Sequence, residues 1–564
     1  MSTQNLDSPY RKSAHPSTPN SPLEAAPSLG HEIRVLEDGR TVLEKDVVIP
    51  MRDGVKLYAN VFRPAENVTA TSPTLVFFAP FGKHGAVPRE RFSNMGVDFS
   101  KLSAYAYWEL PDPLLWVGQW NYSFALVDPR GTWWSEGDAA HYISPEEGRD
   151  GYDVVEWIAQ QTWSTGKVGW GAVSYYAMSA YQTAVLQPPH LAAIMPWEGI
   201  SDIYREVNTQ GGIPNVAFQQ LWMNMTGTGL GLSEDHATLT LEHPLLDELW
   251  ESKVVDWSKI NIPAFSVTGW SSLGLHLRGT IRAWNNFSST KKYLLIHVKT
   301  QSGKEWAEYY NDANVLKQKA FFDRFLKDKP NEVDTWPPVT LDVRTSLETS
   351  TRRSATSFPP PNTTLTPFYL GPANALTTQN TSTEPAAFAS YTAHHANSSV
   401  SFSHTFATRT EITGHASARL HIQALAYPDA DLFLALQKVA PNGSEVRFWH
   451  STQKAEASAS FGWLRASHRE LDGTRSTQGL PVHLHRRRQW LTPTEIVEVE
   501  VELWPSSTVW EAGETMRLVV RGSAFTDEED ATQFKGDRHG FGEVRLWFGG
   551  GYESQLLVPV CGGE

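Results

Sequence analysis

The sequence is poor in cysteine and in positively charged residues, and it has no long apolar run. Its single cysteine, Cys561, in a chain of 564 residues excludes an internal disulfide and a cysteine-based metal cluster. The 48 Lys and Arg residues are outnumbered by 62 Asp and Glu residues, which gives a formal net charge of −14. A large nucleic-acid interface needs clustered cations that displace counterions, so nucleic acid is not an expected partner.

Hydrophobic segments are short throughout the chain. None reaches the ~18 consecutive apolar residues of a membrane-spanning helix, and the N-terminal residues lack the basic-then-apolar order of a signal peptide. We therefore expect a cytoplasmic protein without a membrane span. The histidine pairs at 394–395 and at 483 and 485 have no matching carboxylate pattern, and no glycine-rich phosphate loop is found, so neither a metal nor a cofactor is expected. The chain is compatible with a homo-oligomer.

The length of the chain predicts more than one domain, because a single hydrophobic core rarely supports so many residues. Residues 1–35 are rich in Ser, Pro and Asn without apolar periodicity, which predicts a disordered arm. In 36–200 and 261–340 short apolar runs alternate with helical patterns, which is typical of βαβ crossovers and a mostly parallel sheet. Apolar residues at helical spacings in 201–260 predict a helical cap inserted into this α/β domain.

The last third of the sequence has a different texture. From residue 341 to residue 564 short alternating runs, such as ARLHIQALA (418–426) and IVEVEVELW (496–504), are separated by Pro, Gly, Asn and Asp. Alternation of apolar and polar residues is the signature of strands with one buried face. We therefore expect an all-β jelly-roll domain over 341–564.

The stretch GWGAVSYYAMS places Ser174 between an expected strand, 168–173, and a helix that ends before Pro188. A nucleophile on such a strand-to-helix turn is exposed above the sheet, and the first backbone N–H groups of the helix can hold a developing oxyanion. Small residues flank a nucleophile there because the turn is crowded. Alanines at 172 and 177 stand where glycines are expected.

Several separated segments resemble the CocE/NonD family of α/β-hydrolases, the group of cocaine esterase and X-prolyl dipeptidyl peptidase. Those in the first part of the chain are IPMRDGVKLYANVFRP (49–64), APFGKHG (79–85), VDPRGTWWSEG (127–137), QTWSTGKVGWGAVSYYAMS (161–179), PWEGISDIYREV (196–207) and GWSSLGLHLRG (269–279). Near the C-terminus, FGWLRASHRELD (461–472) and GGGYESQLLVPV (549–560) resemble the family's jelly-roll domain. The resemblance implies an α/β-hydrolase sheet with an inserted helical cap, followed by a jelly roll.

The resemblance also implies roles for single residues. Ser174 matches the family's nucleophile, and the backbone N–H of Tyr175 matches its first oxyanion donor. The second donor in the family is the hydroxyl of a Pro-Tyr pair, but this sequence has Phe81 there. The family's triad acid follows a tryptophan in a W-x-D pattern, but here Ser272 occupies that place after Trp270. The triad is therefore expected to be degenerate.

The general base is open to three assignments. His297, after the last apolar strand of the sheet, occupies roughly the place of the family's histidine and is the predicted base. His276, four residues beyond Ser272, and His84, after the loop of Phe81, are alternatives. Lys83 is a candidate for the missing oxyanion donor. The walls of an apolar pocket are expected from Phe81, Lys83, His84, Trp133, Trp134, Tyr175, Tyr176, Trp197, Trp222, Trp270, Ser272 and His276.

These residues favour a serine hydrolase that acts on an ester or amide of a bulky apolar small molecule. The missing groups matter, because replacing a triad carboxylate costs about 10⁴ in turnover and deleting an oxyanion donor costs about 10²–10³. The alternative is a protein of this fold that has lost hydrolysis and catalyses a cyclisation or isomerisation in the same pocket. A third possibility is a binding module without enzymatic activity, since fold alone does not establish function.

Overall fold

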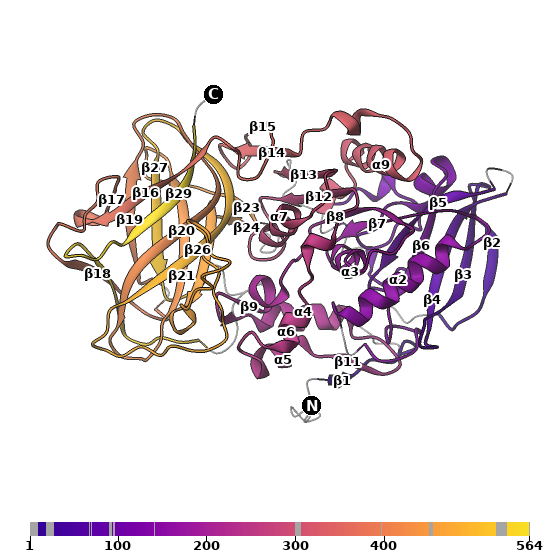
Figure 1. Cartoon of the computed structure of the whole chain (residues 1–564), viewed down its shortest axis with the longest axis horizontal. Coiled ribbons are helices and arrows are strands. Elements are labelled where there is room, and N and C mark those ends of the chain that lie inside the picture. The colour runs from indigo at the N-terminus through magenta and orange to yellow at the C-terminus, as the bar shows by residue number, and fades with distance from the viewer. Residues whose placement is uncertain are drawn as a thin grey trace.

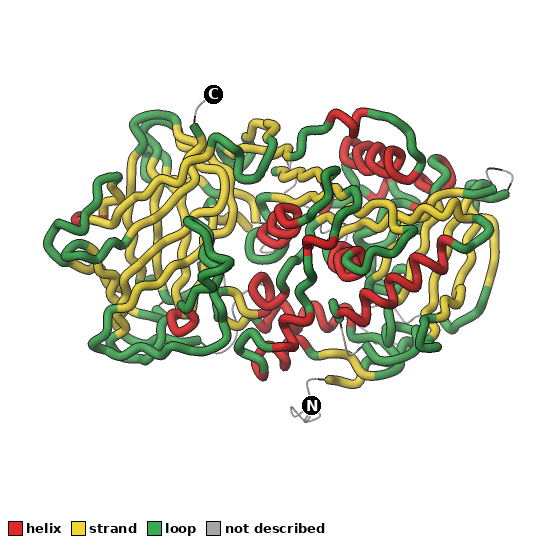
Figure 2. The backbone as a smooth tube through the Cα atoms, viewed as in Figure 1, coloured by secondary structure: helices red, strands yellow, loops and turns green. Residues whose placement is uncertain are grey.

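The computed structural model describes residues 10–18, 27–66, 68, 70–89, 93, 96–139, 142–298, 306–395, 397–450, 455–525 and 538–562. Two bodies lie side by side, an α/β part that contains the N-terminal half of the chain and a β-rich part that contains the C-terminal third (Figure 1). Figure 2 shows that the helices gather in the first body and that strands dominate the second. Within the described ranges, no helix has both the length and the apolar character that crossing a membrane requires.

The first body is built on one large sheet. Its strands follow one another in the order β2 (Glu32–Val35), β3 (Thr41–Pro50), β4 (Lys56–Pro64), β6 (Ser123–Asp128), β5 (Ser72–Phe78), β7 (Ser164–Val173), β8 (Leu191–Trp197), β12 (Ala264–Gly269), β13 (Lys292–His297), β14 (Val339–Arg344) and β15 (Ser350–Ala355). The pairings from β6 to β14 are parallel and those at both ends are antiparallel. The carboxyl ends of β5, β7, β8 and β12 therefore meet along one edge of the sheet.

Helices cover both faces of this sheet, because its central strands are apolar on both sides. In β5, Leu75 and Phe77 face one core, whereas Val76 and Phe78 face the other. Helix α9 (Asp312–Leu326) packs on the first face. On the second face lie α2 (Pro145–Ala159), α3 (Tyr175–Ala184) and α7 (Leu277–Asn286).

The cap region differs from a purely helical one only by short strand pairs. Its elements are η3 (Tyr204–Asn208), β9 (Thr209–Gln210), β10 (Ile213–Pro214), α4 (Val216–Thr226), β11 (Leu232–Glu234), α5 (His236–Glu242), α6 (Glu248–Ser252) and η4 (Trp257–Lys259). Aspartates cap two of these helices, as their N-terminal preference predicts: the side chains of Asp235 and Asp247 accept hydrogen bonds from the second and third N–H groups of α5 and α6.

The N-terminal segment departs from the expectation of a disordered arm over 1–35. Strand β1 (Tyr10–Lys12) pairs antiparallel with β11 of the cap, and β2 adds an edge strand to the main sheet. Backbone pairing with strands that are already formed outweighs the unfavourable composition of this segment. The rest of the expected arm, 1–9 and 19–26, lies outside the described residues.

The C-terminal body is a sandwich of antiparallel strands around its own core. In one layer β20 (Thr410–Ala424) pairs with β26 (Val497–Trp510), β28 (Glu543–Phe548) and β29 (Gln555–Cys561); in the other β27 (Thr515–Arg521) pairs with β19 (Ser399–Thr405) and β21 (Asp431–Val439). Further strands are β16 (Thr363–Gly371), β17 (Ala375–Thr377), β18 (Ala387–Thr392), β22 (Glu445–Val446), β23 (Phe448–His450), β24 (Ala455–Ala457) and β25 (Ser460–Arg465); the short helices and turns are η1 (Phe99–Lys101), η2 (Leu114–Gln119), α8 (Trp306–Tyr309), η5 (Glu332–Thr335), η6 (Pro372–Asn374) and η7 (Ala466–His468).

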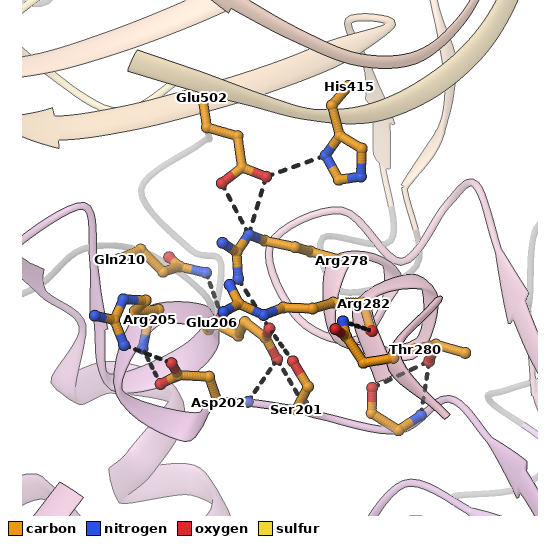
Figure 3. A network of polar contacts seen from close by, with 12 residues as sticks. Ser201, Asp202, Arg205, Glu206, Gln210, Arg278, Thr280, Arg282, His415 and Glu502 are labelled. Carbon is orange, nitrogen blue, oxygen red and sulfur yellow. Dashed lines mark hydrogen bonds and ion pairs between the residues drawn. The ribbon is translucent and has the colours of Figure 1, made fainter. Parts of the chain in front are cut away.

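Alternation along β26 explains how the two bodies meet. Val499, Val501 and Leu503 point into the sandwich core, so Glu502 points out of it. There Glu502 contacts Arg278 of α7, with both carboxylate oxygens 3.0 Å from Nε. Arg278 also donates to Glu206 of η3, with Nη1 3.0 Å from Oε1 (Figure 3). Three elements from distant parts of the sequence are thus joined by one guanidinium.

Candidate active site

Ser174 stands at the corner between β7 and α3, at the carboxyl edge of the sheet. Its backbone has φ 62° and ψ −113°, a conformation that L-residues rarely adopt. The N–H of Ser174 donates to the carbonyl of Trp197 at 2.9 Å, which ties the corner to the end of β8. The strained turn presents the serine hydroxyl above the sheet, as the strand–serine–helix pattern predicts.

His276 is the histidine that contacts Ser174. Its Nε2 lies 3.2 Å from Ser174 Oγ, and its Nδ1 lies 3.3 Å from Ser272 Oγ. His276 occupies the N-cap position of α7, so the turn that follows β12 bends the imidazole back over the sheet edge. The serine and the histidine therefore sit within reach of a direct proton transfer.

The contact with Ser174 comes from His276 and not from His297, the predicted base. His297 ends β13, which is separated from β7 by both β8 and β12, and its Nδ1 lies 3.3 Å from the carbonyl of Val298. His84, the other alternative, packs edge-on against Trp133 with ring centroids 4.4 Å apart. Burial, reinforced by the charge of Lys83, lowers the pKa of His84 to about 3, so its imidazole is neutral near pH 7.

Glu198 is the residue of this site that the sequence analysis missed. It directly follows β8, the strand between β7 and β12, and its Oε2 lies 3.8 Å from His276 Nδ1. Both side chains are only 1% exposed. A charged residue directly after the apolar run LAAIMPW was the available signal, because a carboxylate at the end of a buried parallel strand needs a partner.

The start of α3, next to Ser174, contributes one backbone N–H, and aromatic rings pack beside it. The N–H of Tyr175 is the first of α3, where no intrahelical acceptor exists. The phenol of Tyr175 points elsewhere, donating to Glu147 Oε2 at 2.9 Å. Burial raises the pKa of Glu147 to about 8. The ring of Phe81 lies 6.4 Å from that of Tyr175 and 5.9 Å from that of Tyr176.

Lys83, the candidate for the missing oxyanion donor, contacts two carboxylates. Its ammonium group donates to Asp46 at 2.6 Å, and its backbone N–H donates to Asp128 Oδ1 at 2.7 Å. The ammonium group and the backbone N–H of this buried residue therefore each contact a carboxylate. Burial raises the pKa of Asp128 to about 7 even though the charge and the N–H of Lys83 act to lower it.

Most of the aromatic residues that were predicted to line a pocket belong to one hydrophobic core. Phe81, Trp133, Tyr175, Tyr176 and Trp197 belong to one buried cluster, against which Trp134 and Trp222 pack. Trp222 of α4 stacks on Tyr175 with centroids 5.7 Å apart, which brings the cap onto the start of α3. The indole N–H of Trp134 instead donates to the carbonyl of Pro27 at 2.9 Å.

Two aromatic residues differ from the prediction. Trp270 packs in the core of the opposite face, where its indole N–H donates to the carbonyl of Asp342 at 2.6 Å, so it does not line this wall. Trp306, which the sequence analysis did not select, lies 6.1 Å from His276 between ring centroids. Its indole N–H donates to Glu109 at 2.7 Å. Within the described residues, no group of three or more His, Cys, Asp or Glu side chains could hold a metal ion.

A serine on a strand-to-helix corner, in contact with a buried histidine at the edge of a parallel sheet, defines a serine-type hydrolase. Comparison with known proteins agrees. Residues 53–240 match the family model of the X-Pro dipeptidyl-peptidase (S15 family), and residues 331–557 match that of the X-Pro dipeptidyl-peptidase C-terminal non-catalytic domain. A CocE/NonD family hydrolase from Staphylococcus aureus is 34% identical, with a TM-score of 0.86 over 93% of this chain and 94% of that one. The chain belongs to the CocE/NonD family of hydrolases.

More distant relatives extend the comparison. Cocaine esterase from a Rhodococcus strain is 27% identical over 60% of this chain, and the match spans 64% of that protein, less than two thirds of its length. An aminopeptidase from a marine sediment archaeon shares the fold, with a TM-score of 0.70 at 14% identity over 95% of this chain and 99% of that one.

Proposed function

We propose that this protein hydrolyses an ester or amide of a bulky apolar small molecule through an acyl-enzyme on Ser174, with His276 as the general base. The observation that carries the proposal is the distance of 3.2 Å between Ser174 Oγ and His276 Nε2. A nucleophilic serine needs a base within hydrogen-bond reach, and apo sites often hold that contact at the long end of the range.

The steps follow the usual order of acyl transfer. As Ser174 Oγ attacks the substrate's carbonyl carbon, its proton passes to His276 Nε2. The backbone N–H of Tyr175 donates to the carbonyl oxygen while negative charge develops there. The proton then passes from Nε2 to the leaving group as the bond between carbon and leaving group breaks. In the second half, water loses a proton to the same nitrogen as it attacks the acyl carbon. That proton then passes from Nε2 to Ser174 Oγ as the bond between the acyl carbon and Oγ breaks.

The aromatic residues around the serine support an apolar substrate. The rings of Phe81 and Tyr176 pack 5.9 Å apart beside the start of α3, and Trp306 lies against His276. Aromatic rings would bind a charged acyl group weakly, because desolvating the charge is costly. We therefore infer that the acyl or leaving group next to the scissile bond is apolar.

The site lacks two groups that its family pattern contains, so we expect slower turnover than in a complete site. Phe81 supplies a ring but no hydroxyl, and Ser272 supplies a hydroxyl but no charge. The contact between Ser174 and His276 favours hydrolysis over a cyclisation or isomerisation, because neither of those reactions needs an activated nucleophile.

A fluorophosphonate probe tests the proposal, because it reacts covalently with an activated serine. We expect the intact protein to be labelled at Ser174. The variant Ser174→Ala should not be labelled, and its rate of p-nitrophenyl ester hydrolysis should be lower by about 10³-fold or more. Esters of increasing acyl size should reveal the preference for apolar groups. Hydrolysis that persists in Ser174→Ala would contradict the assignment of the nucleophile.

A further inference from the structure

Glu198 is held rigidly next to the imidazole of His276. Its Oε1 accepts a hydrogen bond from the N–H of Gly269 at 2.7 Å, and its Oε2 accepts one from the hydroxyl of Thr268 at 2.9 Å. Glu198 belongs to the turn after β8, whereas both donors belong to the end of β12. The carboxylate therefore crosses from one strand to the next and stops beside the loop that contains Ser272 and His276.

The backbone of Glu198 also indicates a fixed position. Its φ of 55° lies in the left-handed region, which costs energy for a residue with a side chain. Its N–H donates to the carbonyl of Val267 at 2.8 Å, so the strained turn is tied to β12 as well. Such strain persists only where neighbouring contacts determine the conformation.

We propose that Glu198 supplies the negative charge for His276 that the family's aspartate supplies from the W-x-D position, and that Ser272 orients the ring between them. The inference rests on the proposed role of Ser174 and His276. Glu198 is a positioning residue, because it acts through the imidazole and touches neither the substrate nor the reacting atoms. The acid of the relay has thus moved from the end of β12 to the end of β8.

The sheet order explains why this exchange is possible. The strand β8 lies between β7, which ends at Ser174, and β12, which leads to His276. A side chain from β8 can therefore reach Nδ1 while Nε2 faces the serine. The carboxylate at 3.8 Å and the Ser272 oxygen at 3.3 Å both favour the tautomer with its proton on Nδ1. That tautomer leaves the lone pair of Nε2 free to accept the serine proton.

The proton remains on the histidine during acylation. When Nε2 takes the proton from Ser174 Oγ, the imidazole becomes a cation and Glu198 stays ionised beside it. No second proton transfer to Glu198 is required, since the stabilisation is electrostatic. At 3.8 Å in a buried setting this attraction is strong, although it is weaker than that of a direct hydrogen bond.

The test replaces Glu198 and then restores a carboxylate from the other strand. Glu198→Gln keeps the size of the side chain, and we expect kcat with p-nitrophenyl esters to fall by about 10²–10³-fold, with less change in KM. The acidic limb of the kcat/KM profile should shift to lower pH, since the imidazolium loses its anion. Adding Ser272→Asp should recover activity to within about tenfold of the unmodified enzyme.

Controls separate this inference from fold and from the proposed function. Asp429→Asn removes a buried carboxylate that lies 2.8 Å from a histidine, His539, in the β-rich body, and should leave the pH profile unchanged. If Glu198→Gln fails to fold, Thr268→Val takes its place in the test. It removes one hydrogen bond to Glu198 but keeps the charge, and it should lower kcat by about tenfold.

The outcomes are distinct. If Ser174→Ala and His276→Ala abolish hydrolysis but Glu198→Gln changes neither kcat nor the pH profile, the role of Glu198 is wrong and the proposed function stands. If Ser174→Ala retains activity, the proposed function fails first. A double variant of Glu198→Gln and Ser272→Asp that stays as slow as the single variant would also overturn the proposal.

Discussion

His276 and Arg278 stand two residues apart at the start of α7, yet their polar contacts differ in length. Around His276 the polar distances are 3.2, 3.3 and 3.8 Å. Around Arg278 they are all 3.0 Å, and Nε meets both oxygens of Glu502. The charge-assisted contacts of Arg278 fix a geometry, whereas the contact between the Ser174 hydroxyl and the imidazole joins a proton donor to a possible acceptor. One helix start thus contains both the proposed base and a residue of the contact between the two bodies.

Removing His276 should give the largest effect and should fall on activity alone. We expect His276→Ala to lower kcat/KM for p-nitrophenyl esters by about 10³–10⁴-fold, because the serine loses its base. His297→Ala is the matched control, a histidine of similar burial at the end of β13, and should change kcat/KM by less than about tenfold. The reverse order of the two effects would restore His297 as the base.

Replacing Glu502 should lower the stability of the fold and leave activity unchanged in the molecules that remain folded. Glu502→Gln leaves Arg278 buried without its full partner, and we expect the free energy of unfolding to drop by about 3–5 kcal/mol. Glu498→Gln, on the same strand but with a half-exposed side chain, should change it by less than about 0.5 kcal/mol. Chemical denaturation followed by intrinsic fluorescence measures both. If folded Glu502→Gln lost as much activity as His276→Ala, the contrast between the two polar groups would be wrong.

Sequence patterns predicted where the secondary-structure elements lie but not which side chains are in contact. The position of Ser174 and the alternation that points Glu502 out of its sandwich could be read from the sequence, because both depend on local periodicity. The pairing of Ser174 with His276, and not with His297, depends on the order of strands in the sheet, which periodicity does not give. Glu198 could not be assigned for the same reason: its partner, His276, lies in the turn that follows a neighbouring strand, 78 residues further along the chain.

The oxyanion side offers a way to sharpen the contrast by adding a group. Phe81→Tyr places a phenol where the family pattern has one, and we expect kcat to rise by up to about 10²-fold. Phe77→Tyr is the control. The ring centroid of Phe77 lies 6.3 Å from that of Tyr176 in the same cluster, so this variant buries a hydroxyl and should lower stability without raising kcat. Unchanged kcat in a well-folded Phe81→Tyr enzyme would mean that another donor already completes the hole.

The smallest effect concerns the pH dependence of the domain contact near neutrality. Burial acts to raise the pKa of Glu502, but the charge of Arg278 and the hydrogen bond from His415 outweigh it and lower this pKa to about 2. A carboxyl group whose pKa is lower in the folded state stabilises the fold above its unfolded pKa, near 4.5, and loses that contribution as the pH falls toward 2. The difference in unfolding free energy between the unmodified protein and Glu502→Gln should therefore change by less than about 0.5 kcal/mol from pH 7 to pH 5, and then shrink steadily. A difference that instead grew on acidification would show that the contact at Arg278 does not depend on the charge of Glu502, and the division between a loose catalytic group and a tight structural one would lose its electrostatic basis.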